Sequence, residues 1–289
     1  MKRFVAFAAI LLVAAGFSIL VMGWLLGRPV QRSVGSPPVD LNAEPIRFVS
    51  ESDTIVHGWW CPVSSSHGAV LLLPGIRADR VSMIERARFL RRAGFSVLLI
   101  DFQATGETKG DHITFGWKES RDVLAAIDFI RHGEPSSRIG IIGSSLGGAA
   151  ALLAAPPLKV DALVLEAVYP TIEIATRNRL ENYLGPLRRF GAPLLLMQLH
   201  PRLGISATDL CPLDHVVNVN CPVLIISGAK DRNTRPEDTQ TLFSRVRSSK
   251  QLWLVENAGH VDLHKAATVE YESRVLAFLA EMSDDRQRQ

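Results

Sequence analysis

From residue 45 onward, short apolar runs alternate with amphipathic segments. Residues 69–73 and 95–100 are almost uninterrupted apolar runs, as expected for strands buried on both faces of a sheet. Residues 80–92 and 119–132 repeat their apolar side chains every three or four positions, which is typical of helices. Because strands that alternate with helices need crossover connections, the pattern predicts an α/β fold, with a mostly parallel central sheet and helices on both faces. The full set of predicted strands is 46–50, 54–60, 69–73, 95–100, 138–142, 162–167, 223–226 and 251–255, and the predicted helices are 80–92, 119–132, 145–155 and 261–282.

Residues 168–217 interrupt this alternation. The segment is far longer than a normal connection between a helix and a strand, and it contains many leucines. Parallel sheets bind ligands beyond the carboxyl ends of their strands. We therefore expect residues 168–217 to form a small helical cap over that edge. The alternative is an extra pair of helices with no gating role.

The N-terminal segment has a different pattern. Residues 4–26 contain no charged residue and no proline, and as a helix they would extend about 35 Å, enough to cross a bilayer core of about 30 Å. We therefore expect residues 1–26 to form an N-terminal transmembrane helix, retained as a single-pass anchor. A cleaved secretory signal is the alternative, although its apolar region is usually only about 7–15 residues. Lys2 and Arg3 precede the run, which favours a catalytic domain on the extracytoplasmic side.

The remaining organisation follows from composition. Residues 27–44 are rich in Pro, Gly and Ser and predict a linker, which leaves residues 45–289 as the globular domain. The formal net charge is +3, and Lys2 and Arg3 supply two of these charges, so the composition excludes a nucleic-acid surface. The three cysteines, Cys61, Cys211 and Cys221, include no C-x-x-C pair, which argues against a zinc or redox site. A disulfide between Cys211 and Cys221 is the alternative to free thiols.

The chemistry-bearing motif is Gly143-Ser144-Ser145-Leu146-Gly147, which lies between a predicted strand and a predicted helix. It fits G-x-S-x-G, in which the central serine occupies a tight strand-to-helix turn. Small neighbours are needed there because the backbone is strained and a larger side chain would clash. The motif predicts Ser145 as a nucleophile at the amino end of a helix, where the helix dipole favours developing negative charge.

A serine hydroxyl needs a base to take its proton, and the base needs an orienting acid. In α/β folds that carry G-x-S-x-G in a strand-to-helix turn, the acid and then the histidine follow the serine along the chain. Asp231 follows the predicted strand 223–226, and His260 follows the strand 251–255. We therefore predict Ser145, Asp231 and His260 as a catalytic triad. Glu166 is the alternative acid, and the weaker candidates for the base are His112, His200, His215 and His264.

An oxyanion hole needs two backbone N–H donors. The first is predicted at Leu146, directly after the nucleophile. The second is predicted in the loop after strand 69–73, where Gly75 lets the backbone turn and the amide of Ile76 follows.

These motifs together resemble the α/β-hydrolase superfamily. More narrowly, the chain is similar to its serine aminopeptidase-like and lysophospholipase-like branch, including single-span membrane-anchored members. The resemblance covers residues 45–282 and is carried by LLLPGIRADR, LLIDFQATGET, GSSLGG, CPVLIISGAKD and ENAGH, in the family's order. It implies the same triad and the same oxyanion donors, Ile76 and Leu146. One departure is Pro74-Gly75, where the family usually has His-Gly, and this affects the expected loop shape and substrate polarity.

The expected function is that of a membrane-anchored serine hydrolase. It would cleave an ester or thioester of a hydrophobic, lipid-like acyl group through an acyl-serine intermediate. A serine aminopeptidase or amidase is the enzymatic alternative, and a catalytically inert, membrane-tethered binding protein is the alternative of another class. We expect no metal or organic cofactor, because no cluster of ligands in the sequence argues for one.

Overall fold

The computed structural model describes residues 2–155, 157–184 and 188–284. Three residues of the predicted cap (185–187), five at the end of the predicted domain (285–289) and the first residue of the predicted anchor lie outside this part of the chain. The strands of the main sheet are β2 (Glu44–Ser50), β3 (Thr54–Cys61), β4 (Ala69–Leu73), β5 (Ser96–Ile100), β7 (Ile139–Ser144), β8 (Ala162–Glu166), β9 (Val223–Gly228) and β10 (Lys250–Val255).

In the described residues these strands form one eight-stranded sheet, in the order β10-β9-β8-β7-β4-β5-β3-β2. Only β2 with β3 and β3 with β5 pair in the antiparallel direction. The other pairs are parallel, as between Leu71 of β4 and Ile141 of β7. The predicted α/β fold with a mostly parallel central sheet is therefore confirmed.

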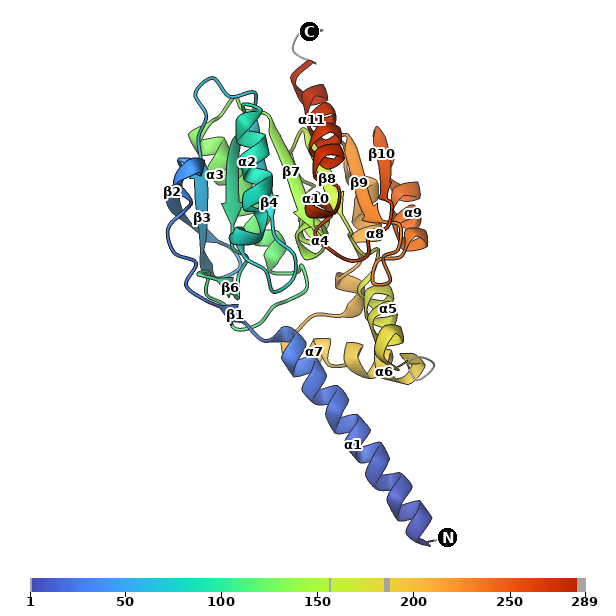
Figure 1. Cartoon of the computed structure of the whole chain (residues 1–289). Coiled ribbons are helices and arrows are strands. Elements are labelled where there is room, and N and C mark those ends of the chain that lie inside the picture. The colour runs from blue at the N-terminus through green and yellow to red at the C-terminus, as the bar shows by residue number, and fades with distance from the viewer. Residues whose placement is uncertain (1, 156, 185–187, 285–289) are drawn as a thin grey trace.

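Helices cover both faces of this sheet (Figure 1). Successive side chains of a strand point to opposite faces, and β4 shows this division. Leu71 and Leu73 pack in one core with helices on that side, whereas Val70 and Leu72 pack in a second core on the other face. The first core includes residues of α3 (Glu119–Gly133), α4 (Leu146–Leu153) and α9 (Pro236–Arg245), and the second includes residues of α2 (Ile84–Arg92), α10 (Leu263–Ala266) and α11 (Thr268–Asp284).

A group of short helices lies between β8 and β9, in the segment predicted as a cap. It contains α5 (Ile172–Leu184), α6 (Arg188–Leu196), α7 (Leu199–Leu203) and α8 (Pro212–His215). In Figure 1, α5, α6 and α7 lie beyond the edge of the sheet, on the side where α1 (Lys2–Gly27) meets the domain. The limits of this cap, 168–217, stay a prediction, as do the domain limits at residues 27 and 45.

The N-terminal segment does form a helix, α1, which projects from the domain (Figure 1). However, a search of the described residues finds no helix with the length and hydropathy needed to span a bilayer. The predicted single-pass anchor, with its extracytoplasmic catalytic domain, is therefore wrong. The prediction treated the whole apolar run as facing lipid, whereas Ile19 and Met22 pack against protein. Their partners are Leu180, Ala192 and Leu195 of the cap.

Polar groups also hold the last turns of α1 against the domain. Gln198 Nε2 donates a hydrogen bond of 3.1 Å to the Ile19 carbonyl, and Arg202 Nη2 donates one of 2.8 Å to the Leu20 carbonyl. The segment that follows lies on the domain surface, because β1 (Val30–Gln31) pairs in parallel with β6 (Thr105–Gly106). The end of α1 is therefore fixed relative to the cap and the sheet.

None of the three cysteines, all of which lie in the described part of the chain, forms a disulfide bond. Cys61, Cys211 and Cys221 are all free thiols, so the alternative of a Cys211–Cys221 disulfide is not realised. Burial raises the pKa of both Cys61 and Cys221 to about 12. These two thiols are therefore protonated and unreactive at neutral pH.

A buried carboxyl group on α3 predicts a pH dependence of stability. Asp122 is fully buried and accepts hydrogen bonds from Ser50 Oγ at 2.7 Å and from the Gln103 amide at 2.8 Å. Burial outweighs these bonds and raises the pKa of Asp122 to about 7. Its unfolded value is near 4, so the folded state holds this proton more tightly than the unfolded state does. The contribution of Asp122 to stability is therefore complete below about pH 4 and is lost as the pH rises through about 7.

The comparison of wild type with Asp122→Asn isolates this effect. We expect the wild-type free energy of unfolding, minus that of the variant, to fall by about 3–5 kcal/mol between pH 4 and pH 8. Urea unfolding at each pH measures the difference, and titration of other groups cancels in it. A difference that stays constant over this range would contradict the prediction.

Candidate active site

Ser145 lies in the turn between β7 and α4. Its backbone has φ 49° and ψ −106°, and such a positive φ costs a non-glycine residue about 1–3 kcal/mol. The Ser145 amide donates a hydrogen bond of 2.7 Å to the Glu166 carbonyl at the end of the adjacent strand β8. Gly147 allows the new helix to start close to the sheet, because a Cβ there would lie 2.4 Å from the Leu73 carbonyl oxygen. The strained turn is thus held by the neighbouring strands on both sides.

Asp231 and His260 come from the loops that follow β9 and β10. His260 Nδ1 and Asp231 Oδ2 are 2.8 Å apart, in hydrogen-bond contact. The Asp231 side chain is buried, and its other oxygen accepts hydrogen bonds from the amides of Asn233 (2.7 Å) and Thr234 (2.9 Å). The carboxylate therefore has a fixed orientation, with one oxygen held by the backbone and the other directed at the imidazole.

The two loops are also tied to each other. The Ala229 amide donates to the Val255 carbonyl at 2.9 Å, and the Lys230 amide donates to the Ala258 carbonyl at 2.8 Å. This approach requires a glycine at residue 228, because a Cβ there would lie 2.4 Å from the Ala258 carbonyl oxygen. The loop of the acid and the loop of the histidine therefore form one unit.

Ser145 and His260 line the same cavity, which we call the catalytic cavity. Its volume is about 520 Å³, within the usual range of small-molecule sites. Its walls are mostly apolar and come from α1, the loop after β4, α4, α5 and α6. The lining residues are Met22, Leu26, Ile76, Phe115, Ser145, Leu146, Tyr169, Ile172, Ala175, Thr176, Arg179, Leu180, Leu195, Asn233 and His260.

The two predicted oxyanion donors border this cavity as well. Leu146 is the first residue of α4, and the first N–H groups of a helix have no partner within the helix. Ile76 lies in the turn after β4, where the Ala78 amide donates to the Gly75 carbonyl at 3.1 Å. Within the described chain, neither the Ile76 nor the Leu146 amide donates a hydrogen bond to another protein group. Both amides are therefore available to a bound oxyanion.

Glu166, the alternative acid, is occupied elsewhere. Its carboxylate accepts hydrogen bonds from Arg86 Nε at 2.9 Å and from Arg86 Nη2 at 2.7 Å, and it also accepts one from the Tyr271 hydroxyl. Arg86 belongs to α2 and Tyr271 to α11, on the face of the sheet opposite α3 and α4. The structure therefore directs this carboxylate away from the catalytic cavity.

The other histidines also lie apart from Ser145. His264 Nε2 is 3.0 Å from Glu272 Oε1, and its ring stacks on Phe89. His200 is exposed on the cap, and His215 lines a different cavity. His112 lines a smaller cavity between α1 and the cap and does not line the catalytic one.

Sequence reasoning missed two sets of residues that matter to the site. The first is Met22 and Leu26 of α1, which line the catalytic cavity but belong to a run interpreted as a membrane anchor. The second is Arg86, which holds Glu166 beneath the turn of Ser145. A signal for Arg86 was present, because it lies three residues after Met83 and one before Ala87, within the buried face of its helix. A charge at such a position indicates a buried partner.

Comparisons with known proteins agree with this fold. The sequence profile described as "Alpha/beta hydrolase family" matches residues 55–272. The chain is 24% identical over 238 residues to the uncharacterized protein YqkD of Bacillus subtilis, covering 79% of this chain and 76% of that protein. It is 29% identical over 209 residues to an uncharacterized protein of Mycobacterium tuberculosis, covering 71% of this chain and 68% of the relative.

Solved structures show the same arrangement of sheet and helices. An esterase of Pyrococcus furiosus, Pf2001, superposes with a TM-score of 0.73 at 23% identity, covering 89% of this chain and 98% of the esterase. An esterase from Exiguobacterium antarcticum superposes with a TM-score of 0.61 at 14% identity, covering 82% of this chain and 100% of that one. At such identities the likeness shows a shared fold.

Proposed function

Because the chain belongs to the alpha/beta hydrolase family, we propose that it is a serine hydrolase that cleaves an ester or thioester of a hydrophobic acyl group. One observation carries the proposal. Ser145 and His260 line the same apolar cavity, and the imidazole of His260 is hydrogen-bonded at 2.8 Å to the buried carboxylate of Asp231.

The proposed reaction passes through an acyl-serine intermediate. His260 Nε2 takes the proton of the Ser145 hydroxyl as its oxygen attacks the substrate carbonyl carbon, and Asp231 stabilises the resulting imidazolium. The amides of Ile76 and Leu146 bind the negative oxygen of the tetrahedral adduct. His260 then gives its proton to the departing alcohol or thiol, and the bond to that group breaks. Water, deprotonated by the same imidazole, attacks the acyl-serine and releases the acid.

The cavity wall favours an acyl ester over an aminopeptidase substrate. An aminopeptidase must receive a free α-ammonium group, which is normally paired with a carboxylate. Within the described chain no aspartate or glutamate lines the catalytic cavity, whereas Arg179 does. A cationic substrate would therefore meet a like charge and a largely apolar wall. The two solved structures of the same fold that are described as esterases also support an ester substrate.

Active-site labelling tests the proposed nucleophile. We expect a fluorophosphonate probe to label the wild-type protein and to give no labelling of Ser145→Ala. The matched control is Ser144→Ala, one residue earlier in the same motif, which should be labelled like the wild type. Folded wild-type protein that resists the probe would refute the serine hydrolase and favour an inert binding protein.

A substrate series separates the two kinds of hydrolase. We expect p-nitrophenyl esters of aliphatic acids to be cleaved with a higher kcat/KM than any aminoacyl p-nitroanilide. The reverse order would assign the site to the aminopeptidase class.

A further inference from the structure

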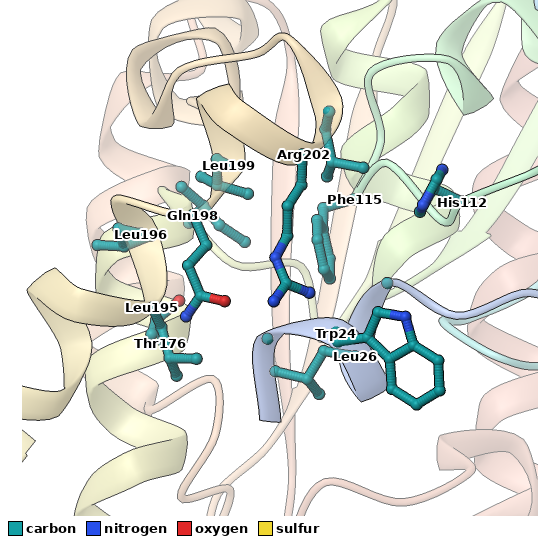
Figure 2. Close-up of a pocket in the computed structure, with 14 residues that line it drawn as sticks. Trp24, Leu26, His112, Phe115, Thr176, Leu195, Leu196, Gln198, Leu199 and Arg202 are labelled. Carbon is teal, nitrogen blue, oxygen red and sulfur yellow. The ribbon is translucent and has the colours of Figure 1, made fainter. Parts of the chain in front are cut away.

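A second cavity lies beside the catalytic one, between the last turn of α1 and the cap. Figure 2 shows its wall, to which Trp24 and Leu26 of α1 contribute together with Gln198 and Arg202 of the cap. Its volume is about 80 Å³, compared with about 30 Å³ for one water molecule in the liquid. A space of this size admits a few methylene groups of an extended chain.

The two cavities share part of their walls. The shared side chains are Leu26, Phe115, Ile172, Thr176 and Leu195. Four of these five are apolar, so an alkyl chain that extends from one cavity to the other would stay in contact with apolar side chains. Ser145 lines the catalytic cavity and does not line the second one.

We infer that the second cavity is the subsite for the distal end of a long acyl chain, and that the last turn of α1 sets the chain length the enzyme accepts. This inference rests on the proposed acyl-ester hydrolase function. An acyl group bound to Ser145 has its carbonyl at the oxyanion donors and its alkyl tail along the apolar wall. The tail then passes the shared side chains and ends between α1 and α6.

Hydrogen bonds to backbone carbonyl groups hold α1 in place for this role. The side chains of Gln198 and Arg202 donate hydrogen bonds to the backbone carbonyls of Ile19 and Leu20 in α1. Arg77 Nη1 donates a hydrogen bond of 3.0 Å to the Leu25 carbonyl. Arg77 directly follows Ile76, the predicted oxyanion donor. The helix end is therefore tied both to the cap and to the loop beside the reacting carbonyl.

Gly23 offers a way to fill the second cavity alone. It lines that cavity and does not line the catalytic one. A Cβ at Gly23 would lie 2.5 Å from Gln198 Oε1, the far end of a flexible side chain, so Gly23→Leu forces bulk into the space. Gly16, on the same helix, has no atom within 4 Å of the site of a Cβ. Gly16→Leu is therefore the matched control.

The experiment measures kcat/KM for p-nitrophenyl butyrate, octanoate and dodecanoate with the wild type and both variants. Each methylene buried by the wild type is worth about fourfold in kcat/KM. We expect Gly23→Leu to lower the dodecanoate-to-butyrate ratio at least about tenfold, the loss of two or three buried methylenes, and Gly16→Leu to keep the wild-type ratio. Leu196→Ala widens the second cavity from α6 and should raise the same ratio, which guards against a Gly23→Leu protein that misfolds.

The outcomes separate this inference from the proposed function. If wild-type protein cleaves butyrate but Gly23→Leu and Leu196→Ala both keep the wild-type ratio, the acyl chain does not enter the second cavity and the inference is overturned. If Gly16→Leu changes the ratio as much as Gly23→Leu, the effect belongs to α1 in general and the subsite is again rejected. If wild-type protein cleaves no ester of any length, the proposed function itself fails.

Discussion

Replacing His260 by alanine is expected to lower kcat for p-nitrophenyl butyrate by about 10⁴- to 10⁶-fold. His260 supplies the one imidazole on the wall of the catalytic cavity within the described chain, so no second base can take the Ser145 proton. Asp231→Asn should cost about 10⁴-fold, because an amide cannot both accept from the imidazole and stabilise its charged form. Steady-state kinetics on folded protein measures both losses, and His200→Ala, an exposed cap histidine, should stay within about twofold of wild type.

The losses of kcat caused by Ser145→Ala and His260→Ala are not expected to multiply when the two substitutions are combined. Residues that act in one proton transfer lose most of their effect once a single member is gone. The double variant Ser145→Ala/His260→Ala is therefore expected to be no slower than Ser145→Ala alone. A double variant slower by the product of the two single losses would show that His260 acts independently of Ser145 and would contradict the triad.

Replacing Arg86 by methionine is expected to lower the free energy of unfolding by about 3–5 kcal/mol. Arg86 and Glu166 are 2% and 1% exposed and form a two-pronged ion pair. Burial alone would lower the pKa of Arg86, but the neighbouring charge of Glu166 holds it well above its ordinary value. Loss of the guanidinium leaves a buried carboxylate with no counter-charge. The Arg86 side chain also bonds Asp262 at 2.9 Å, two residues after His260.

The double variant Arg86→Met/Glu166→Gln tests this explanation. Removing both charges of a buried pair is often nearly neutral, whereas removing one is not. We therefore expect the double variant to regain at least about half of the stability that Arg86→Met loses, as measured by urea unfolding at pH 7. A double variant no more stable than Arg86→Met would place the loss in packing and not in the unpaired charge.

Much of the sheet could be predicted because buried parallel strands have a simple pattern. The runs at 69–73 and 95–100 contain a single polar residue, Ser96, and they form β4 and β5, with β5 beginning one residue later than predicted. The closeness of Asp231 and His260 followed from topology and not from spacing, since neighbouring parallel strands end at the same edge. Their role, like that of Ser145, Ile76 and Leu146, stays a prediction until the variants are measured.

Other features were beyond the reach of the sequence. Glu166 is the last residue of the buried strand β8, close to where a catalytic acid would lie. Only the alternation of side chains along β8 directs its carboxylate to the opposite face, where Arg86 and Tyr271 hold it. The run containing Met22 and Leu26 is apolar on every side, so its pattern cannot tell whether lipid or protein covers it. The packing of Met22 against the cap required the three-dimensional arrangement.

The pairing of β1 with β6 has a consequence for how such a site can change. Val30 is fixed to the domain by a 2.8 Å hydrogen bond from its amide to the Ala104 carbonyl, and α1 ends only three residues earlier, at Gly27. Each residue advances an α-helix by about 100°. Inserting or deleting a single residue within the last turn of α1 would rotate the preceding part of the helix by about 100° relative to Val30 and would exchange Met22 and Leu26 for their neighbours. The number of residues between Met22 and Val30 thus determines which side chains of α1 line the cavities. One insertion would therefore alter the acyl preference of the enzyme and leave its catalytic groups unchanged.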